Sequence, residues 1–334
     1  MKTGNAFVIT LLLSVLLFSS CGSNEVRNQG LPSVIGGAGE LLVVIDKGKW
    51  ESALGDTLRY VLAAQVPNVT QEEPYFDLIQ TQDDKFKGVY KNHRNLLIVS
   101  IKPSSRPSLS FKDDMWASPQ LVGYLVAPSV DSMINLVLRE GEAIRNKFAF
   151  KEIDRWIRIN QKSPNRKVVD DLKKKHNYWV SVPSSYSLDV NKDHFVWIAS
   201  ESPDVTLGIT AWDYPYTSKD QLSDENLIKK RNEVVKENVP GPVEKSYMKT
   251  EEVLTPIAAE FVYKGRYFKQ MRGLWKLENA FMGGSFVSLT TVDDARKRII
   301  TVEGFVYAPR KEKRNYLRQL EGILYTLQVV KDEK

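Results

Sequence analysis

The chain contains a single cysteine, Cys21, and its position limits how the rest of the molecule can be stabilised. Residues 1–20 carry one charge, on Lys2, followed by an apolar run and the small residues Ser19 and Ser20. An apolar stretch that ends in small residues before a cysteine is typical of a lipoprotein signal peptide. We therefore expect cleavage before Cys21 and acylation of its sulfur. The mature chain then keeps no free thiol, so core packing alone must hold it together.

The apolar run that precedes Cys21 extends from Ala6 to Phe18. A helix needs roughly 20 apolar residues to cross the hydrocarbon core of a bilayer, so this run is too short for a permanent span. A short signal anchor is the alternative interpretation. We expect the mature protein to be held at a membrane of the cell envelope by an N-terminal lipid.

The net charge of the chain is +6 at pH 7, which is small for 334 residues. No nucleic-acid-binding motif is present in the sequence, so we expect no nucleic acid partner. A solvated helix face is the expected role of the densest basic run, and contact with anionic lipid headgroups is the alternative. This run contains Arg310, Lys311, Lys313, Arg314 and Arg318.

Composition and hydrophobic pattern divide the chain into five expected parts. These are a signal peptide at 1–20, a flexible tether at 21–39, a first α+β domain at 40–150, a helical connector at 151–176 and a second α+β domain at 177–334. The tether is rich in Gly, Ser, Asn and Pro and lacks hydrophobic periodicity. The connector has a helical pattern that is interrupted at Pro164.

Both domains are predicted to combine strands with covering helices. In the first domain, strands are expected at 40–46, 75–81, 95–101 and 120–127, and the main helix follows Pro128. In the second domain, a capping box of Ser218 and Gln221 starts a helix, and four alternating segments between 257 and 307 predict an antiparallel meander. The expected fold class is α+β, with two α/β-sandwich-like domains whose largely antiparallel sheets are covered by helices.

One local sequence occurs twice in the chain. Gly123-Tyr124-Leu125-Val126-Ala127-Pro128 reappears as Gly304-Phe305-Val306-Tyr307-Ala308-Pro309, and in the helices that follow Gly141 aligns with Gly322. A glycine inside a helix costs about 1 kcal/mol relative to alanine, so a shared helical glycine needs a structural reason. Close approach of the helix backbone to the sheet would supply that reason. We therefore hypothesise an internal duplication.

Most enzyme chemistries lack their residues in this sequence. The three histidines, His93, His176 and His194, are isolated, so no metal site is expected. No nucleotide-binding motif occurs, and no cofactor is expected. A glycosidase needs two carboxylates across a cleft, whereas adjacent acids such as Asp293-Asp294 are typical of solvated turns. No catalytic residue is therefore assigned, and a carboxylate-dependent hydrolase of envelope polymers is the alternative function.

The second half combines aromatic residues, an arginine and glycines in an unusual way. Aromatic faces beside an arginine bind sugar rings, peptides or partner proteins, and glycine within a strand marks a bulge or the close approach of another chain. The alternative is that the aromatics fill the core between helix and sheet while the glycines shape bulges. The candidate binding residues are Trp212, Tyr214, Arg272, Trp275, Met282, Gly283 and Gly284.

Several of these segments carry a family resemblance. Gly39 to Val44, Arg272-Gly273-Leu274-Trp275, Phe281-Met282-Gly283-Gly284 and the closing helix after Ala308-Pro309 resemble an uncharacterised lipoprotein family of Bacteroidota, a domain of unknown function of the DUF4837 type. The resemblance spans essentially the mature chain, although Ser285 stands where the family tends to have proline. It implies no activity. In Bacteroidota, acidic residues directly after the acylated cysteine favour surface export, so the single acid in residues 22–25 implies the periplasmic face of the outer membrane.

The second half also resembles the small α+β sandwiches of the photosystem-associated PsbP and Mog-type group. This resemblance rests on Val182-Pro183-Ser184-Ser185-Tyr186 and on the closing helix. Shared topology does not imply shared function. The sequence therefore predicts a lipid-anchored, non-enzymatic binding or assembly module of the cell envelope, with an envelope protein or glycan as its partner.

Overall fold

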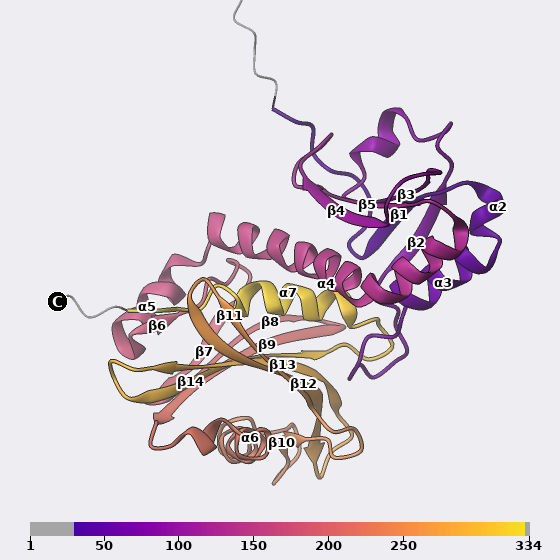
Figure 1. Cartoon of the computed structure of the whole chain (residues 1–334). Coiled ribbons are helices and arrows are strands. Elements are labelled where there is room, and N and C mark those ends of the chain that lie inside the picture. Colours follow the sequence, from indigo (N-terminus) through magenta and orange to yellow (C-terminus); the bar gives the residue numbers. More distant parts are fainter. Residues whose placement is uncertain (1–29, 331–334) are drawn as a thin grey trace, which may run out of the picture.

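One long helix, α4 (Val130–Lys162), joins the two domains of the protein (Figure 1). The computed structural model describes residues 30–330. Met133 and Phe148 of α4 belong to the core of the first domain, whereas Ile153 and Ile157, nearer the end of the helix, belong to the core of the second. The expected domain boundary at residue 150 falls inside this continuous helix, so both domains share it.

The first domain is built on a five-stranded sheet with the order β2-β1-β3-β5-β4. Its strands are β1 (Glu40–Val44), β2 (Asp77–Thr81), β3 (Asn95–Ile101), β4 (Ser108–Asp113) and β5 (Leu121–Ala127). Three of the four strand pairs are parallel, and the β4–β5 pair is antiparallel. The expectation of a largely antiparallel sheet is therefore wrong for this domain. β1, β3 and β5 are nearly continuous apolar runs, a pattern typical of parallel strands covered on both faces.

Helices cover one face of this sheet and loops cover the other. The helices that precede α4 are α2 (Lys47–Trp50), α3 (Ala53–Leu62) and the 3₁₀ helix η1 (Gly88–Asn92). α3 packs with α4 over the main core of the domain. On the opposite face, Leu42, Leu96 and Val122 form a small apolar cluster with Phe86 and Trp116, which come from loops.

Residues 33–39 lie against the folded body. Ile35 forms a β-bridge with His93, and its N–H donates to Asn92 O at 2.9 Å. The Asn315 side chain donates to Ala38 O at 3.0 Å. The end of the expected tether is therefore part of the folded body, because its backbone is hydrogen-bonded to the first domain and to α7. The expected signal peptide, Cys21 and the tether up to residue 29 lie outside the described residues.

An antiparallel sheet forms the second domain, in the order β10-β12-β13-β14-β9-β8-β7, and β11 also pairs with β12. Its strands are β7 (Ser187–Lys192), β8 (Phe195–Ser202), β9 (Val205–Pro215), β10 (Tyr247–Thr250), β11 (Ile257–Tyr263), β12 (Arg266–Glu278), β13 (Gly283–Asp293) and β14 (Arg298–Tyr307). β6 (Tyr178–Trp179) and β15 (Gln328–Val329) form a separate small sheet. The expected antiparallel meander is confirmed as β11 to β14, and the α+β fold class is confirmed.

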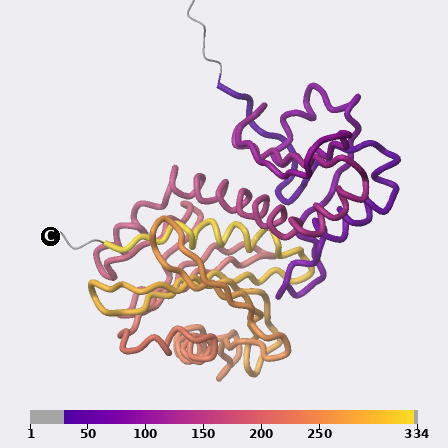
Figure 2. The backbone as a smooth tube through the Cα atoms, in the orientation of Figure 1, coloured from indigo at the N-terminus to yellow at the C-terminus, as the bar shows by residue number. Residues whose placement is uncertain are grey.

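Helices cover both faces of this larger sheet. They are α5 (Arg166–His176), the 3₁₀ helix η2 (Lys219–Leu222), α6 (Asp224–Asn238) and α7 (Arg314–Leu324). α6 packs on one face, and α7 packs on the other beside the second half of α4, as Figure 2 shows for the C-terminal segment. Ser218 and Gln221 form the expected capping box at η2. A buried ion pair fixes α6 to the sheet, with Arg231 Nε 2.7 Å from Glu303 Oε2.

Buried charged groups join the two domains at the start of α7, and we call this contact the α7 junction. The Glu73 carboxylate accepts from the backbone N–H of Lys313 at 2.6 Å and of Arg314 at 2.7 Å. The Arg314 guanidinium donates to Asp77 Oδ2 at 2.7 Å. Lys313, Arg314 and Arg318 are 4%, 3% and 5% exposed. For these three residues of the basic run, the expected solvated helix face and the alternative lipid contact are both wrong, because the first domain covers them.

The repeated sequence unit consists of a strand, an Ala-Pro pair and a helix. It is formed once by β5 and α4 and again by β14 and α7. A Cβ atom on Gly141 would lie 2.2 Å from Val61 Cγ1 of α3, and one on Gly322 would lie 2.2 Å from Trp156 Cβ of α4. Each glycine therefore permits two helices to approach, not a helix and a sheet as expected. β5 has one parallel and one antiparallel neighbour, whereas both neighbours of β14 are antiparallel. The hypothesised duplication is thus not supported beyond this local unit.

Candidate functional site

Two of the expected binding residues, Trp212 and Trp275, lie in the core. Each is 3% exposed and packs beneath α6 in a cluster with Phe286 and Phe305. The Trp275 indole N–H donates to Val306 O at 3.3 Å, within the sheet. Aromatic rings supply much of the apolar area there because α6 itself buries only three residues. The expectation that these two tryptophans contact a partner is therefore wrong, and the alternative that they fill the core is right.

Arg272 and Tyr214 lie on opposite faces of the sheet. Arg272 faces α7, where its guanidinium pairs with the Glu321 carboxylate. Burial alone would lower the pKa of Arg272, but Glu321 raises it above its ordinary value. Tyr214 packs against α6 with Lys230 Nζ 5.2 Å from its ring centroid, and burial raises the pKa of Tyr214 to about 12. The two residues therefore do not share a binding surface.

The expected glycine pair lies where β13 begins. A Cβ atom on Gly284 would lie 2.0 Å from Val306 O, so this glycine permits close packing of β13 against β14. Gly283 is exposed, and Met282 packs at the border of the cluster that holds the tryptophans. The fully exposed aromatic residue of this segment is Phe281, which its sequence pattern does not distinguish from the buried ones. The candidate residues therefore do not form one site.

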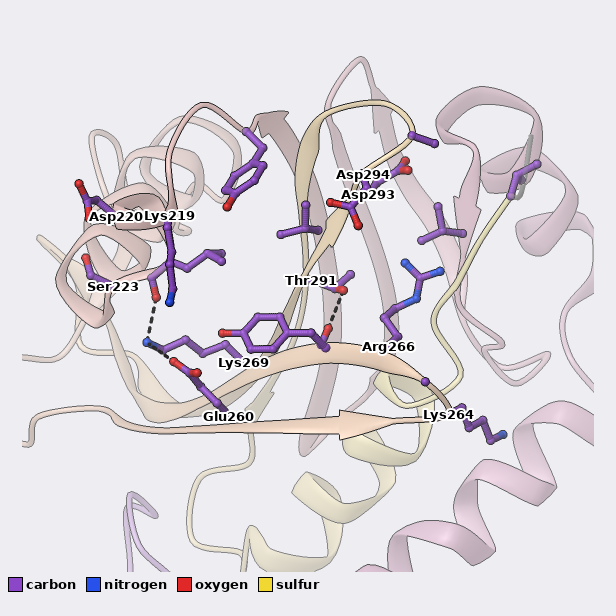
Figure 3. Close-up of a pocket in the computed structure, with 18 residues that line it drawn as sticks. Lys219, Asp220, Ser223, Glu260, Lys264, Arg266, Lys269, Thr291, Asp293 and Asp294 are labelled. Atoms are coloured by element: carbon purple, nitrogen blue, oxygen red, sulfur yellow. Dashed lines mark hydrogen bonds and ion pairs between the residues drawn. The ribbon is translucent and has the colours of Figure 1, made fainter. Parts of the chain in front are cut away.

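An open groove lies at one end of the eight-stranded sheet, and we call it the sheet-end groove (Figure 3). Its cavity volume is about 1020 Å³. Its lining comes from segments 216–223, 260–269, 291–295 and 329–330. These segments are the entry to α6, the β11–β12 hairpin, the β13–β14 turn and the end of β15. The groove thus forms where two hairpins of the meander meet the chain that leads into α6.

Lys269 crosses the floor of the groove towards α6 (Figure 3). Its ammonium donates to Leu222 O at 2.8 Å and lies 2.5 Å from Asp224 Oδ1 and 3.5 Å from Glu260 Oε1. Burial alone would lower the pKa of Lys269, but Asp224 and Glu260 raise it above its ordinary value. One ammonium therefore serves two carboxylates, and Glu260 is the more distant of the two.

Asp293 anchors the opposite wall of the groove. It is 4% exposed, and its Oδ2 lies 3.0 Å from Arg298 Nε and 3.4 Å from Arg296 Nη1. Arg298 also donates to His176 O at 2.7 Å, which ties this wall to α5. The neighbouring Asp294 is exposed. The expectation of a solvated acidic pair is therefore right for Asp294 and wrong for Asp293.

Three basic side chains of the lining complete the charge pattern. Lys219 and Lys264 are exposed, and Arg266 is half-buried. Among residues 30–330, none of these three forms an ion pair with a carboxylate. Asp220 and Asp294 carry the opposite charge on the same rim. The rim therefore presents both signs of charge, whereas the Lys269 ammonium and the Asp293 carboxylate are already held in ion pairs.

Two of the groove's carboxylates, Glu260 and Asp293, are held in ion pairs, whereas Asp220 and Asp294 lie on the rim. Within the described residues, no group of three or more His, Cys, Asp or Glu side chains is placed to hold a metal ion. With Tyr216 and Tyr267 in its lining, the groove can bind a surface that carries both charges and apolar area.

The residues of the groove are ordinary turn residues in the sequence. Lys264-Gly265 and Asp293-Asp294 each lie in or beside a hairpin turn, where charged side chains in water are usual. Their proximity depends on strand pairing and on where α6 begins, which tertiary packing decides. One signal was available, because charges of both signs gather at the same end of successive hairpins.

The fold and the groove define a two-domain α+β protein with an open groove at the end of an antiparallel sheet. Residues 165–326 match the family described as a domain of unknown function (DUF4837), and residues 34–161 match the family described as a domain of unknown function (DUF8532). The expected resemblance to DUF4837 is therefore confirmed over residues 165–326 but not over essentially the whole mature chain, because residues 34–161 match a different family. Neither description names an activity.

Solved structures provide distant likenesses only. A mutant of the protein Mog1 and the Saccharomyces cerevisiae Ran-binding protein Mog1p are each 10% identical to the chain, with TM-scores of 0.30 and 0.31. These matches cover 47% and 46% of this chain and 92% and 90% of theirs. A protein from Bacteroides thetaiotaomicron is also 10% identical, with a TM-score of 0.21 and 47% of each chain covered. A comparison with curated proteins gave no match.

Proposed function

We propose that this protein is a lipid-anchored, non-enzymatic binding module of the cell envelope, and that its sheet-end groove holds a partner protein. The observation that carries the proposal is an open groove of about 1020 Å³ bordered by a strand, β11, whose outer edge is unpaired in the described chain. Unpaired main-chain groups of a strand bind another polypeptide. The edge therefore favours a protein partner over a glycan.

The charges of the rim support the same conclusion. Protein surfaces carry both signs of charge, and complementary charges select partners and speed association more than they add affinity. Lys219, Lys264 and Arg266 stand on the rim with Asp220 and Asp294, so the groove is not dominated by one sign. A polyanion would meet repulsion from the two aspartates, whereas a protein surface of mixed charge would not.

The proposed anchor is a lipid on Cys21 at the periplasmic face of the outer membrane. It is supported by the signal-peptide pattern of residues 1–20. Among residues 30–330, no helix is long and apolar enough to cross a membrane. The chain enters the first domain at residues 33–35 (Figure 1), whereas the lining of the groove comes from the second domain. An N-terminal anchor would therefore leave the groove accessible.

Detergent phase separation tests the anchor. Wild-type protein is expected in the Triton X-114 phase, and Cys21→Ser is expected in the aqueous phase because it lacks the acylated sulfur. Aqueous partition of the wild type would contradict the anchor without affecting the groove.

Photocrosslinking in cells tests the groove. p-Benzoylphenylalanine is introduced in place of Tyr216, in the lining, or of Tyr60, which is 77% exposed on α3 in the first domain. We expect one discrete protein adduct from position 216 and none from position 60, and Arg266→Ala should weaken the adduct. Equal adducts from both positions, or no protein adduct from the groove, would overturn the proposal.

A further inference from the structure

We propose that the partner adds an extended strand to the free edge of β11 and places a basic side chain opposite Glu260. This inference rests on the proposed function, since β11 and Glu260 border the sheet-end groove. It specifies the chemistry of the partner segment. The segment has apolar residues two positions before and two positions after a lysine or arginine.

Of the strands that border the larger sheet, β7 is protected. The register between β7 and β8 shifts between Leu188 and Val190, which is a β-bulge. Lys175 Nζ of α5 donates to Asn191 O at 2.7 Å, and His176 Nε2 lies 2.7 Å from Asn191 Oδ1. A bulge and a covering helix are devices that prevent an edge strand from pairing with another chain.

β10 is also protected. Met248 N–H donates to Val239 O at 3.0 Å, and Gly241 N–H donates to Ser246 O at 2.9 Å. The Thr250 N–H donates to Asn232 Oδ1 of α6 at 2.8 Å. The chain that follows α6 therefore already occupies the outer edge of β10.

Among residues 30–330, nothing protects the outer edge of β11 in these ways. The strand pairs with β12 over residues 257–263 without a shift of register, and it contains no proline. The two-residue turn Lys264-Gly265 has φ angles of 49° and 77°, which suit a tight hairpin that fixes this register. Ile257 and Val262 are 49% and 71% exposed. A regularly paired and partly apolar edge of seven residues is a template for an added strand.

The hairpin also decides which backbone groups point outwards. Tyr263 pairs with Arg266 across the two-residue turn, so their backbone groups bond to each other. Because this pattern alternates along a strand, the N–H and C=O groups of Ala258, Glu260 and Val262 point to the free edge. The side chains of these three residues share one face of the sheet. An added strand therefore meets a surface of the form apolar, acidic, apolar.

Glu260 supplies the charge preference. Its side chain is 59% exposed, and it shares the single ammonium of Lys269 with Asp224, which lies closer to that ammonium. Two carboxylates with one ammonium leave room for a second cation. A lysine or arginine directly opposite on an added strand provides it, since opposite charges stabilise cross-strand pairs.

The same residue disfavours a second copy of this chain as the occupant. Antiparallel pairing of two β11 strands with the greatest overlap places Ala258 opposite Val262 and Glu260 opposite Glu260. Like charges directly opposite one another on neighbouring strands are destabilising. The complementary partner segment is therefore a basic one from another protein.

Labelled heptapeptides test the inference by fluorescence anisotropy with the full chain. One probe alternates threonine and valine around a central lysine, and the second has glutamate at the centre. We expect the wild type to prefer the lysine probe by about two- to five-fold, the size of a cross-strand charge pair. Glu260→Lys should reverse the preference. The matched control Asp189→Lys, a charge reversal at an exposed position of β7, should not change it.

Ala258→Pro tests the main-chain contact. Its N–H points to the free edge, so proline removes an outward donor without removing a bond to β12. Both probes should bind at least about ten-fold more weakly. Circular dichroism verifies that the variant is folded, and Val262→Pro provides the same test if it is not.

Three results would overturn the inference. They are equal binding of the two probes to the wild type, unchanged binding to both folded proline variants, and a wild-type dimer that Ala258→Pro makes monomeric. If neither peptide shows the expected binding but the adduct from position 216 is still formed, the groove binds its partner in another way and the proposed function stands. If that adduct is absent as well, the proposed function fails with the inference.

Discussion

The α7 junction and the sheet-end groove contain similar charged side chains but use them differently. At the junction, Glu73 and Arg314 are 1% and 3% exposed, and their partners come from the other domain. In the groove, Lys219 and Lys264 are exposed, and one lysine serves two carboxylates. Buried charges with a complete set of partners hold the domains together, whereas exposed charges with an incomplete set are available to another molecule. Substitutions should therefore change stability at the junction and binding in the groove.

The largest loss of stability is expected for Glu73→Ala. The change leaves the first backbone N–H groups of α7 buried without their acceptor and removes a negative charge from between the domains. We expect the free energy of unfolding to fall by about 3 kcal/mol, measured by urea denaturation. Glu72→Ala, at the exposed neighbouring position, should stay within about 0.5 kcal/mol of the wild type. Equal effects of the two changes would show that the junction charges are not structural.

Gly322→Ala should also destabilise the protein. The added Cβ would lie 2.2 Å from Trp156 Cβ and 3.1 Å from its backbone carbon, so α7 and α4 must separate. We expect a loss of about 2 kcal/mol in the same assay. The sign is informative, because helix propensity alone predicts a gain of about 1 kcal/mol for this change. A stabilised variant would mean that the helices do not need their close approach.

Asp224→Asn should have a smaller effect that depends on pH. In the folded protein, the pKa of Lys269 lies above its ordinary value of 10.5 because of Asp224 and Glu260. The stabilisation is therefore fully present below pH 10.5 and is lost as the pH rises through the folded pKa. We expect a loss of less than about 1 kcal/mol at pH 7, because Asp224 is 57% exposed. A difference from the wild type that persists unchanged at pH well above 10.5 would contradict this origin.

Arg266→Ala should change stability least. Arg266 has no carboxylate partner in the described chain, so we expect a change within about 0.5 kcal/mol. Crosslinking from position 216 should nevertheless decline, because a rim charge is lost. A fall of more than about 1 kcal/mol in the free energy of unfolding would show that Arg266 is structural, like the charges of the α7 junction. The contrast between the junction and the groove would then not hold.

Local patterns predicted much of the fold. The apolar positions Met133, Val137, Ile144 and Phe148 of α4 are all buried, and the four strands of the meander lie where alternation indicates. The parallel direction of the strands in the first domain was not predicted. The continuous apolar runs of β1, β3 and β5 were the available signal, because such runs are typical of parallel pairing.

The candidate site was predicted poorly for a physical reason. Both faces of the larger sheet are covered over most of its area, so aromatic residues such as Trp212 and Trp275 become core. Arg272 and Trp275 are three positions apart on β12, and side chains at an odd separation in a strand point to opposite faces. The alternation of side chains along a strand therefore already predicts that Arg272 and Trp275 cannot share one binding surface. The groove depends instead on contacts between distant segments, 216–223 with 260–269 and 291–295, which no local pattern encodes.

The shared helix limits how these two sequence families can be recombined. The match to the second family begins at residue 165, after α4 has ended, yet Ile153 and Ile157 of α4 complete that domain's core. A polypeptide reduced to 165–326 would expose to water the surface of α7 that meets Trp156. Such a fragment would therefore need a substitute helix, from a fused segment or from a neighbouring molecule, to keep that surface away from water.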